Sequence, residues 1–114
     1  MTNEEIATRY LFVDMAIKNM QLDLQHIQNG PQKIKQPYIV MVEKLISKGM
    51  KERRILKKLM YEEKIRVEFQ FSQGDFSTYF FYIGNEKRIK TYNRSIIKRN
   101  VEEIMMELIK EEQH

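Results

Sequence analysis

The feature that most constrains the fold of this chain is a periodic apolar stripe near its N-terminus. Apolar residues recur there at alternating steps of four and three, the period of one side of a helix: Ile6, Tyr10, Val13, Ile17, Met20, Leu24 and Ile27. Thr2 and Glu5 have the spacing of a capping box, and Gly30-Pro31 stops the pattern. A helix over residues 3–29 would be about 40 Å long. Such a helix would extend past a small core or pair with another helix.

The next segment carries two short apolar stripes separated by a glycine. After a connector over residues 30–36, the first stripe predicts a short helix that Gly49 can end: Tyr38, Met41, Val42 and Leu45. The second stripe predicts another helix almost at once: Ile55, Leu56, Leu59 and Met60. Two helices joined by a few residues that include glycine are a candidate helix-turn-helix. We therefore expect three N-terminal helices.

The apolar period changes from helical to alternating at Ile65, which indicates a half-buried strand over residues 65–72. Turn residues at 73–75 separate it from a second, aromatic strand over 76–83. Residues 87–92 are the candidate for a third, basic strand, so two or three antiparallel strands are expected. A final helix is predicted to begin near Asn93 as N-cap. The predicted fold is a single helix-rich α+β domain over residues 1–114, with three N-terminal helices, an antiparallel aromatic sheet and a C-terminal helix.

Composition excludes several kinds of chemistry. The chain has no cysteine, which removes thiolate nucleophiles and every zinc site built on cysteine. Asp23 and His26, three residues apart on the first helix, are the candidate pair of metal ligands, and we interpret them as surface residues. No phosphate-binding glycine loop or serine elbow is present. We therefore expect no enzyme activity, no metal and no cofactor. The acidic start and the short apolar runs favour a cytoplasmic protein without a membrane partner.

Charge is unevenly distributed along the chain. The net charge is +4, but residues 31–60 carry +7 and residues 84–100 carry +5, while the three segments around them are acidic. If the two basic blocks lie side by side, their charge would merge into one surface that attracts phosphate. The alternative is that these residues are the ordinary solvated sides of amphipathic elements.

A helix-turn-helix followed by a hairpin resembles the element order of winged-helix regulators. That resemblance implies a second helix in the DNA major groove, with a basic set that contacts phosphates: Lys48, Lys51, Arg53, Arg54, Lys57, Lys58, Arg88 and Lys90. Arg53 and Arg54 are the candidates for guanine recognition, because a guanidinium can bond O6 and N7 together. The leading hypothesis is a small nucleic-acid-binding or regulatory protein.

Two other interpretations remain open. Exposed rings of the aromatic strand could stack single-stranded bases beside Arg88 and Lys90, although we favour a sheet that is covered on both faces. The periodic first helix also supports a helical adaptor that binds another protein, including a homodimer formed through the first or last helix.

Overall fold

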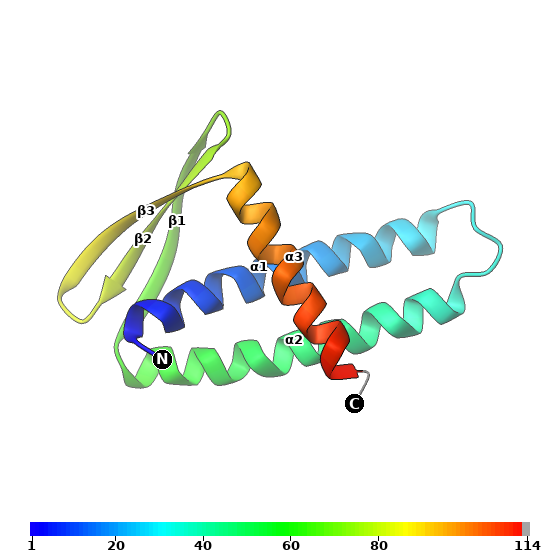
Figure 1. Cartoon of the computed structure of the whole chain (residues 1–114), viewed down its shortest axis with the longest axis horizontal. Helices are drawn as coiled ribbons and strands as arrows, with labels where there is room; N and C mark the ends of the chain where they lie inside the picture. Colours follow the sequence, from blue (N-terminus) through cyan, green and yellow to red (C-terminus); the bar gives the residue numbers. More distant parts are fainter. Residues whose placement is uncertain (113–114) are drawn as a thin grey trace.

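The computed structural model describes residues 1–112 and contains three helices and three strands (Figure 1). In chain order these are α1 (Asn3–Asn29), α2 (Gln36–Glu62), β1 (Ile65–Gln73), β2 (Phe76–Ile83), β3 (Glu86–Asn93) and α3 (Arg94–Glu112). The helix-rich α+β class with an antiparallel sheet is confirmed. Figure 1 shows α1 and α2 as a long antiparallel hairpin, with the sheet at one end and α3 crossing the hairpin. No helix among the described residues has an apolar stretch long enough to span a membrane.

The first helix has the bounds that its stripe predicts. Thr2 and Glu5 form the capping box: Glu5 N–H donates to Thr2 Oγ1 at 3.1 Å, and Thr2 N–H donates to Glu5 Oε1 at 3.4 Å. Of the stripe, Ile6, Val13, Ile17 and Met20 are buried. Residues off the stripe are buried as well, namely Ala7, Leu11, Phe12 and Ala16. The helix is apolar on more than one side because it contacts α2, α3 and the sheet.

The second helix runs without a break through Gly49, where the sequence indicated a turn between two helices. Gly49 is buried within α2, and a β-carbon built on it would lie 2.9 Å from Ile17 Cγ1 of α1. The glycine therefore allows the two helices to approach closely and does not end a helix. The predictions of three N-terminal helices and of a helix-turn-helix are wrong, and the resemblance to a winged helix loses its basis.

The sheet is an antiparallel meander in the order β1-β2-β3, so the third strand is confirmed. Gly74 and Gly84 occupy its two turns with φ of 59° and 61°, a left-handed conformation that glycine adopts without steric cost. A bulge between Phe69 and Phe71 shifts the register of β1 against β2. Ile96 N–H donates to Asn93 Oδ1 at 2.8 Å, which confirms Asn93 as the N-cap of α3.

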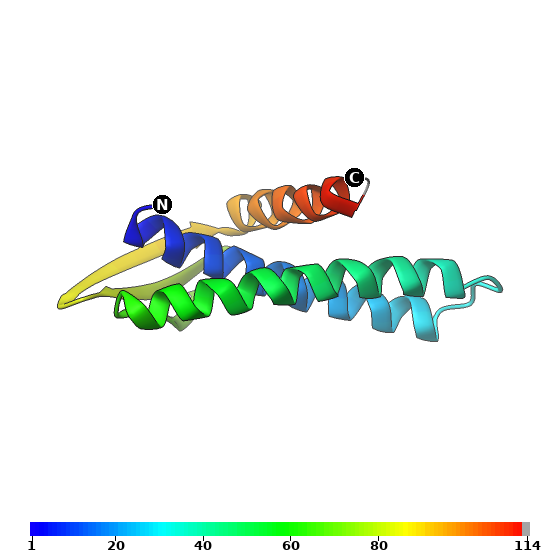
Figure 2. The same cartoon turned by 90° about the horizontal axis from the view of Figure 1, so that it is seen from below.

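All three helices lie on one face of the sheet. Tyr79 and Phe81 of β2 point into the core and are 8% and 0% exposed. On the opposite face, Phe71, Phe76 and Ile89 are each more than half exposed. The expectation of a sheet covered on both faces is therefore wrong. Figure 2 shows α3 as a separate layer on one side of the α1–α2 hairpin, and Figure 1 shows no helix beyond the sheet.

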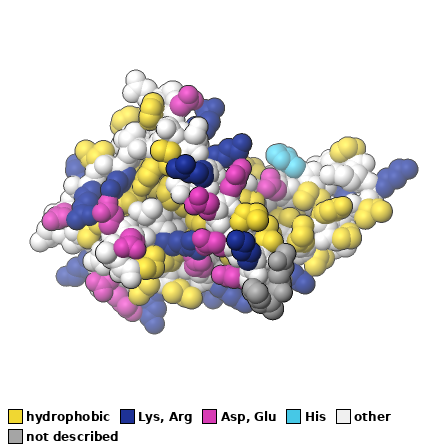
Figure 3. Space-filling model, in the orientation of Figure 1, with side chains coloured by type: hydrophobic (Ala, Val, Ile, Leu, Met, Phe, Trp, Pro, Cys, Tyr) yellow, Lys and Arg dark blue, Asp and Glu magenta, His cyan; other side chains and the backbone are white. Residues whose placement is uncertain are grey.

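The hairpin extends well past the core. Met20 is the last buried residue of α1 and Leu45 is the first of α2, so the helical ends between them bury no residue fully. Apolar side chains remain exposed there: Leu22, Ile34, Tyr38, Val40 and Met41. Figure 3 shows hydrophobic side chains gathered at this far end of the molecule.

Candidate nucleic-acid interface

The outward side of α2 carries a row of exposed cations. Five exposed cations form this row, which we call the basic side of α2: Lys44, Lys51, Arg54, Lys57 and Lys58. The opposite side of the helix packs against the core through Leu45, Gly49, Leu56 and Met60. None of the five cations forms an ion pair with another residue in the described part of the chain. Their charge therefore faces solvent.

Two further members of the predicted set lie closer to the core. Arg53 is on the inner side of α2, and its Nη1 donates to Asp14 Oδ1 of α1 at 2.7 Å. Burial acts to raise the pKa of the Asp14 carboxyl, but hydrogen bonds from Lys18 and Arg53 hold it below its ordinary value. Arg53 is thus engaged in an ion pair between helices, and Lys48 is half-buried. The sequence period alone could not separate Arg53 from its exposed neighbour Arg54.

The second basic block is joined to α1 and not to α2. Arg88 and Lys90 lie on the helix-facing side of β3, where both form ion pairs with Glu4. Arg88 also donates to Glu86 at 3.0 Å. The hydrogen bond from Lys90 and the charge of Arg88 lower the pKa of Glu4. β3 is at the opposite edge of the sheet from β1, which follows α2, so the structure does not bring the two predicted blocks together.

The uncovered face of the sheet combines rings with cations. We call this the open face; it presents Phe71, Phe76, Phe80, Tyr82 and Ile89 together with Arg66, Glu68 and Lys87. Arg66 lies 4.3 Å from the ring centroid of Tyr82, and Lys87 lies 4.4 Å from that of Phe80. The alternation of β2 predicted which rings share a face, but local sequence carries no signal for which face the helices leave uncovered.

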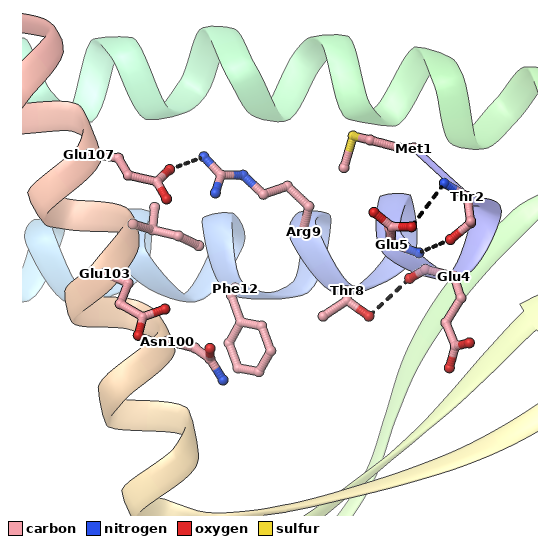
Figure 4. Close-up of a pocket in the computed structure, with 11 residues that line it drawn as sticks. Met1, Thr2, Glu4, Glu5, Thr8, Arg9, Phe12, Asn100, Glu103 and Glu107 are labelled. Atoms are coloured by element: carbon pink, nitrogen blue, oxygen red, sulfur yellow. Dashed lines mark hydrogen bonds and ion pairs between the residues drawn. The ribbon is translucent and has the colours of Figure 1, made fainter.

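A cavity of about 570 Å³ opens between the start of α1 and the middle of α3 (Figure 4). In the wall of this cavity, Arg9 forms an ion pair with Glu107 of α3 at 2.7 Å. Arg9 also pairs with Glu52 of α2 at 2.6 Å. The hydrogen bonds that Arg9 donates to Glu52 raise the pKa of Arg9, so this guanidinium is a permanent charge that joins three helices. Among the side chains that the structure describes, residues 1–111, no three acidic or histidine groups lie together so that they could hold a metal ion. We interpret the cavity wall as a structural junction.

Comparison with known proteins gives one match. The model of the YhjD protein family matches residues 1–113 of the chain. No curated protein and no solved structure matches it. Because the family model covers both helices of the hairpin, the sheet and α3, the chain belongs to the YhjD protein family.

Proposed function

We propose that this protein is a small, non-enzymatic nucleic-acid-binding protein that contacts phosphates through the basic side of α2. The observation that carries the proposal is the arrangement of Lys44, Lys51 and Lys58, which recur at steps of seven along one line of the helix. Arg54 lies between the last two of them in the sequence. All four side chains are exposed, and none forms an ion pair with a side chain of residues 1–111.

The dimensions of this row suit a polyanion. Lys44 and Lys58 are fourteen residues apart in α2, a distance of about 21 Å at the helical rise of about 1.5 Å per residue. A DNA duplex carries roughly one negative charge per 1.7 Å of its axis, so a phosphate backbone can meet several of these cations together. Such contacts supply affinity and orientation but carry no sequence information. Arg54 is the exposed arginine of the predicted pair, and we propose it as the candidate for a base contact.

Binding of a labelled duplex, measured by fluorescence anisotropy at several salt concentrations, tests the proposal. Loss of three phosphate contacts in Lys51→Glu/Arg54→Glu/Lys58→Glu should lower the steepness of the salt dependence by about three. For three contacts, a fourfold rise in salt weakens binding about forty-fold. The matched control is Lys33→Glu/Lys98→Glu/Arg99→Glu, which makes the same charge change at exposed positions outside α2.

The control variant should retain most of the steepness of the salt dependence. Equal loss in both triple variants would mean that only net charge matters, which contradicts a defined interface on α2. Absence of duplex and single-strand binding at low salt would contradict nucleic-acid binding as a whole.

A second candidate function, self-association as a helical adaptor, is favoured by the exposed apolar far end of the hairpin. The core stripe of α1 is used within the protomer, since Ile17 is 0% exposed. A homodimer through α1 would therefore use Leu22, which is more than half exposed, as is Met41 of α2. A homodimer through α3 would use Met106, which is also more than half exposed. We expect Leu22→Glu/Met41→Glu to fold normally and to shift a dimer to monomer in sedimentation. A wild-type monomer at high concentration would rule this candidate out.

The remaining expectations about function stay predictions. They are a regulatory role, the absence of enzyme activity and a location in the cytoplasm. The binding experiment does not test these three expectations, because nucleic-acid binding through α2 is compatible with either outcome for each of them.

A further inference from the structure

We propose that the open face of the sheet is a stacking platform for single-stranded nucleic acid. The inference rests on the proposed function and deepens it, because it names the form of nucleic acid and a second contact surface. Bases of a duplex are stacked on each other and cannot reach side-chain rings, whereas bases of a single strand can. The open face would therefore distinguish the two forms, while the basic side of α2 would contact phosphates in both.

The rings are arranged as a track along the central strand. Phe76, Phe80 and Tyr82 of β2 point to the open face, and Phe71 of β1 adds a ring beside them. The ring centroids of Phe80 and Tyr82 are 6.3 Å apart. From Phe76 to Tyr82 the strand rises about 20 Å at about 3.3 Å per residue, which is enough for a few nucleotides. Both neighbouring strands lie beside this track, so the rings are fixed on a rigid sheet and not on a loop.

Cations flank the rings on both edge strands. In the register of the sheet, Tyr82 lies between Arg66 of β1 and Lys87 of β3. These side chains already contact ring faces, Arg66 that of Tyr82 and Lys87 that of Phe80. A base that stacks on Tyr82 or Phe80 would displace this cation from the ring face toward the edge of the track, where the guanidinium or ammonium can pair with the phosphate. The arrangement thus offers both of the contacts that a nucleotide makes.

Charge favours an anionic partner over a second copy of the chain. The open face holds two cations and one carboxylate, Glu68, which is already paired with Arg66 at 2.9 Å. A second open face would add the same excess of positive charge to a buried interface. In addition, only Glu63 and Lys64 separate α2 from β1, so the C-terminal end of α2 adjoins the end of the sheet that carries Arg66 (Figure 1). A single strand could contact both surfaces.

The test compares ring variants on the two faces of the sheet. Phe76→Leu/Phe80→Leu keeps apolar side chains on the open face but removes two stacking surfaces. Phe69→Leu is the matched control, because Phe69 is 58% exposed but lies on the helix-facing side, opposite Tyr79. Fluorescence anisotropy measures the affinity of each variant for a labelled single strand of about ten nucleotides and for a duplex of the same sequence. Thermal unfolding confirms that all variants are folded.

We expect the open-face variant to lose about tenfold or more of its affinity for the single strand and to keep its duplex affinity, because one stacked base contributes about 1–3 kcal/mol and 1.4 kcal/mol is tenfold. The control should bind both forms like the wild type. The inference is overturned if the open-face variant binds the single strand normally while the α2 triple variant does not, a result that leaves the proposed function intact. It is also overturned if the ring changes only dissociate a dimer in sedimentation. If the ring variants lose single-strand binding but the α2 variant loses nothing, the inference stands and α2 is not the interface.

Discussion

Gly49 of α2 lies directly against Ile17 of α1, so closely that a β-carbon at Gly49 would stand 2.9 Å from Ile17 Cγ1. Ile17 is fully buried, and Leu108 of α3 lies on the other side of the same contact, 3.7 Å from that position. The three helices can therefore pack this closely only because Gly49 has no side chain. A side chain there would push the hairpin apart at the centre of the core.

Gly49→Ala should destabilise the protein although alanine is the better helix former. The gain in helix propensity is about 1 kcal/mol, but overpacking a closed core costs about 1–3 kcal/mol. We expect a net loss of up to about 2 kcal/mol in the free energy of unfolding, measured with urea. Ser47→Ala is the control on the exposed side of the same helix and should be neutral or slightly stabilising. An increase in stability with Gly49→Ala would contradict the close approach.

Replacement of Arg9 should weaken the joint between the three helices. Arg9 binds Glu52 through Nε and Glu107 through Nη2, and its side chain is only 26% exposed. Arg9→Met leaves two carboxylates without their partner, so we expect a loss of about 1–3 kcal/mol in urea unfolding. Arg9→Lys should recover only part of this, because an ammonium cannot reproduce the fork. Arg66→Met at the exposed pair with Glu68 is the control and should change stability by less than about 1 kcal/mol.

The ion pair of Asp14 with Arg53 and Lys18 predicts a specific loss of stability in acid. The pKa of Asp14 is lowered from its ordinary value of 3.8 in the folded state, so its contribution is present above that value and is lost as the pH falls below about 4. Asp14→Asn should therefore be less stable than the wild type at neutral pH, and the two should converge in acid. Asp75→Asn, at an exposed carboxylate, should follow the wild-type curve. Parallel curves for Asp14→Asn and the wild type would show that its charge does not stabilise the fold.

Glu4 should mask the second basic block from nucleic acid. Because Arg88 and Lys90 already pair with Glu4, Arg88→Ala should weaken duplex binding less than Lys58→Ala does. Glu4→Gln releases Lys90 and removes one of the two carboxylates that pair with Arg88, so it should raise affinity a few-fold at low salt, with the gain disappearing at high salt. Anisotropy titrations at two salt concentrations measure both effects. If Arg88→Ala costs as much affinity as Lys58→Ala, Arg88 contacts phosphate despite its ion pair.

The sequence was sufficient to predict the features that depend on contacts between residues close together in the chain. The capping box of Thr2 and Glu5, the N-cap of Asn93 and the turn at Gly74 all act between residues close in the chain. For the same reason the bounds of α1 and the pairing of β1 with β2 were predictable. Gly49 was not, because glycine serves both to end a helix and to allow another helix to approach, and only the neighbour at Ile17 selects the second role.

The candidate interface was predictable only in part, for a related reason. The charge of the segment that contains Lys51 and Lys58 could be read directly, and so could its helical period. Arg53 pairs with Asp14, and both Arg88 and Lys90 pair with Glu4. These carboxylates lie far away in the sequence, since Glu4 is 84 residues from Arg88. No spacing rule reports such a pair.

The sequence by itself determined the helix-rich α+β class, the capped first helix, the aromatic hairpin and the concentration of positive charge in α2, because propensity, periodicity and charge are properties of neighbouring residues. The tertiary structure alone decided that α2 passes unbroken through Gly49, that Glu4 pairs with Arg88 and Lys90 of β3, and that one face of the sheet stays open. Each of these depends on which distant surface comes into contact. Packing and ion pairing are settled by proximity in space, which the order of residues along the chain does not display.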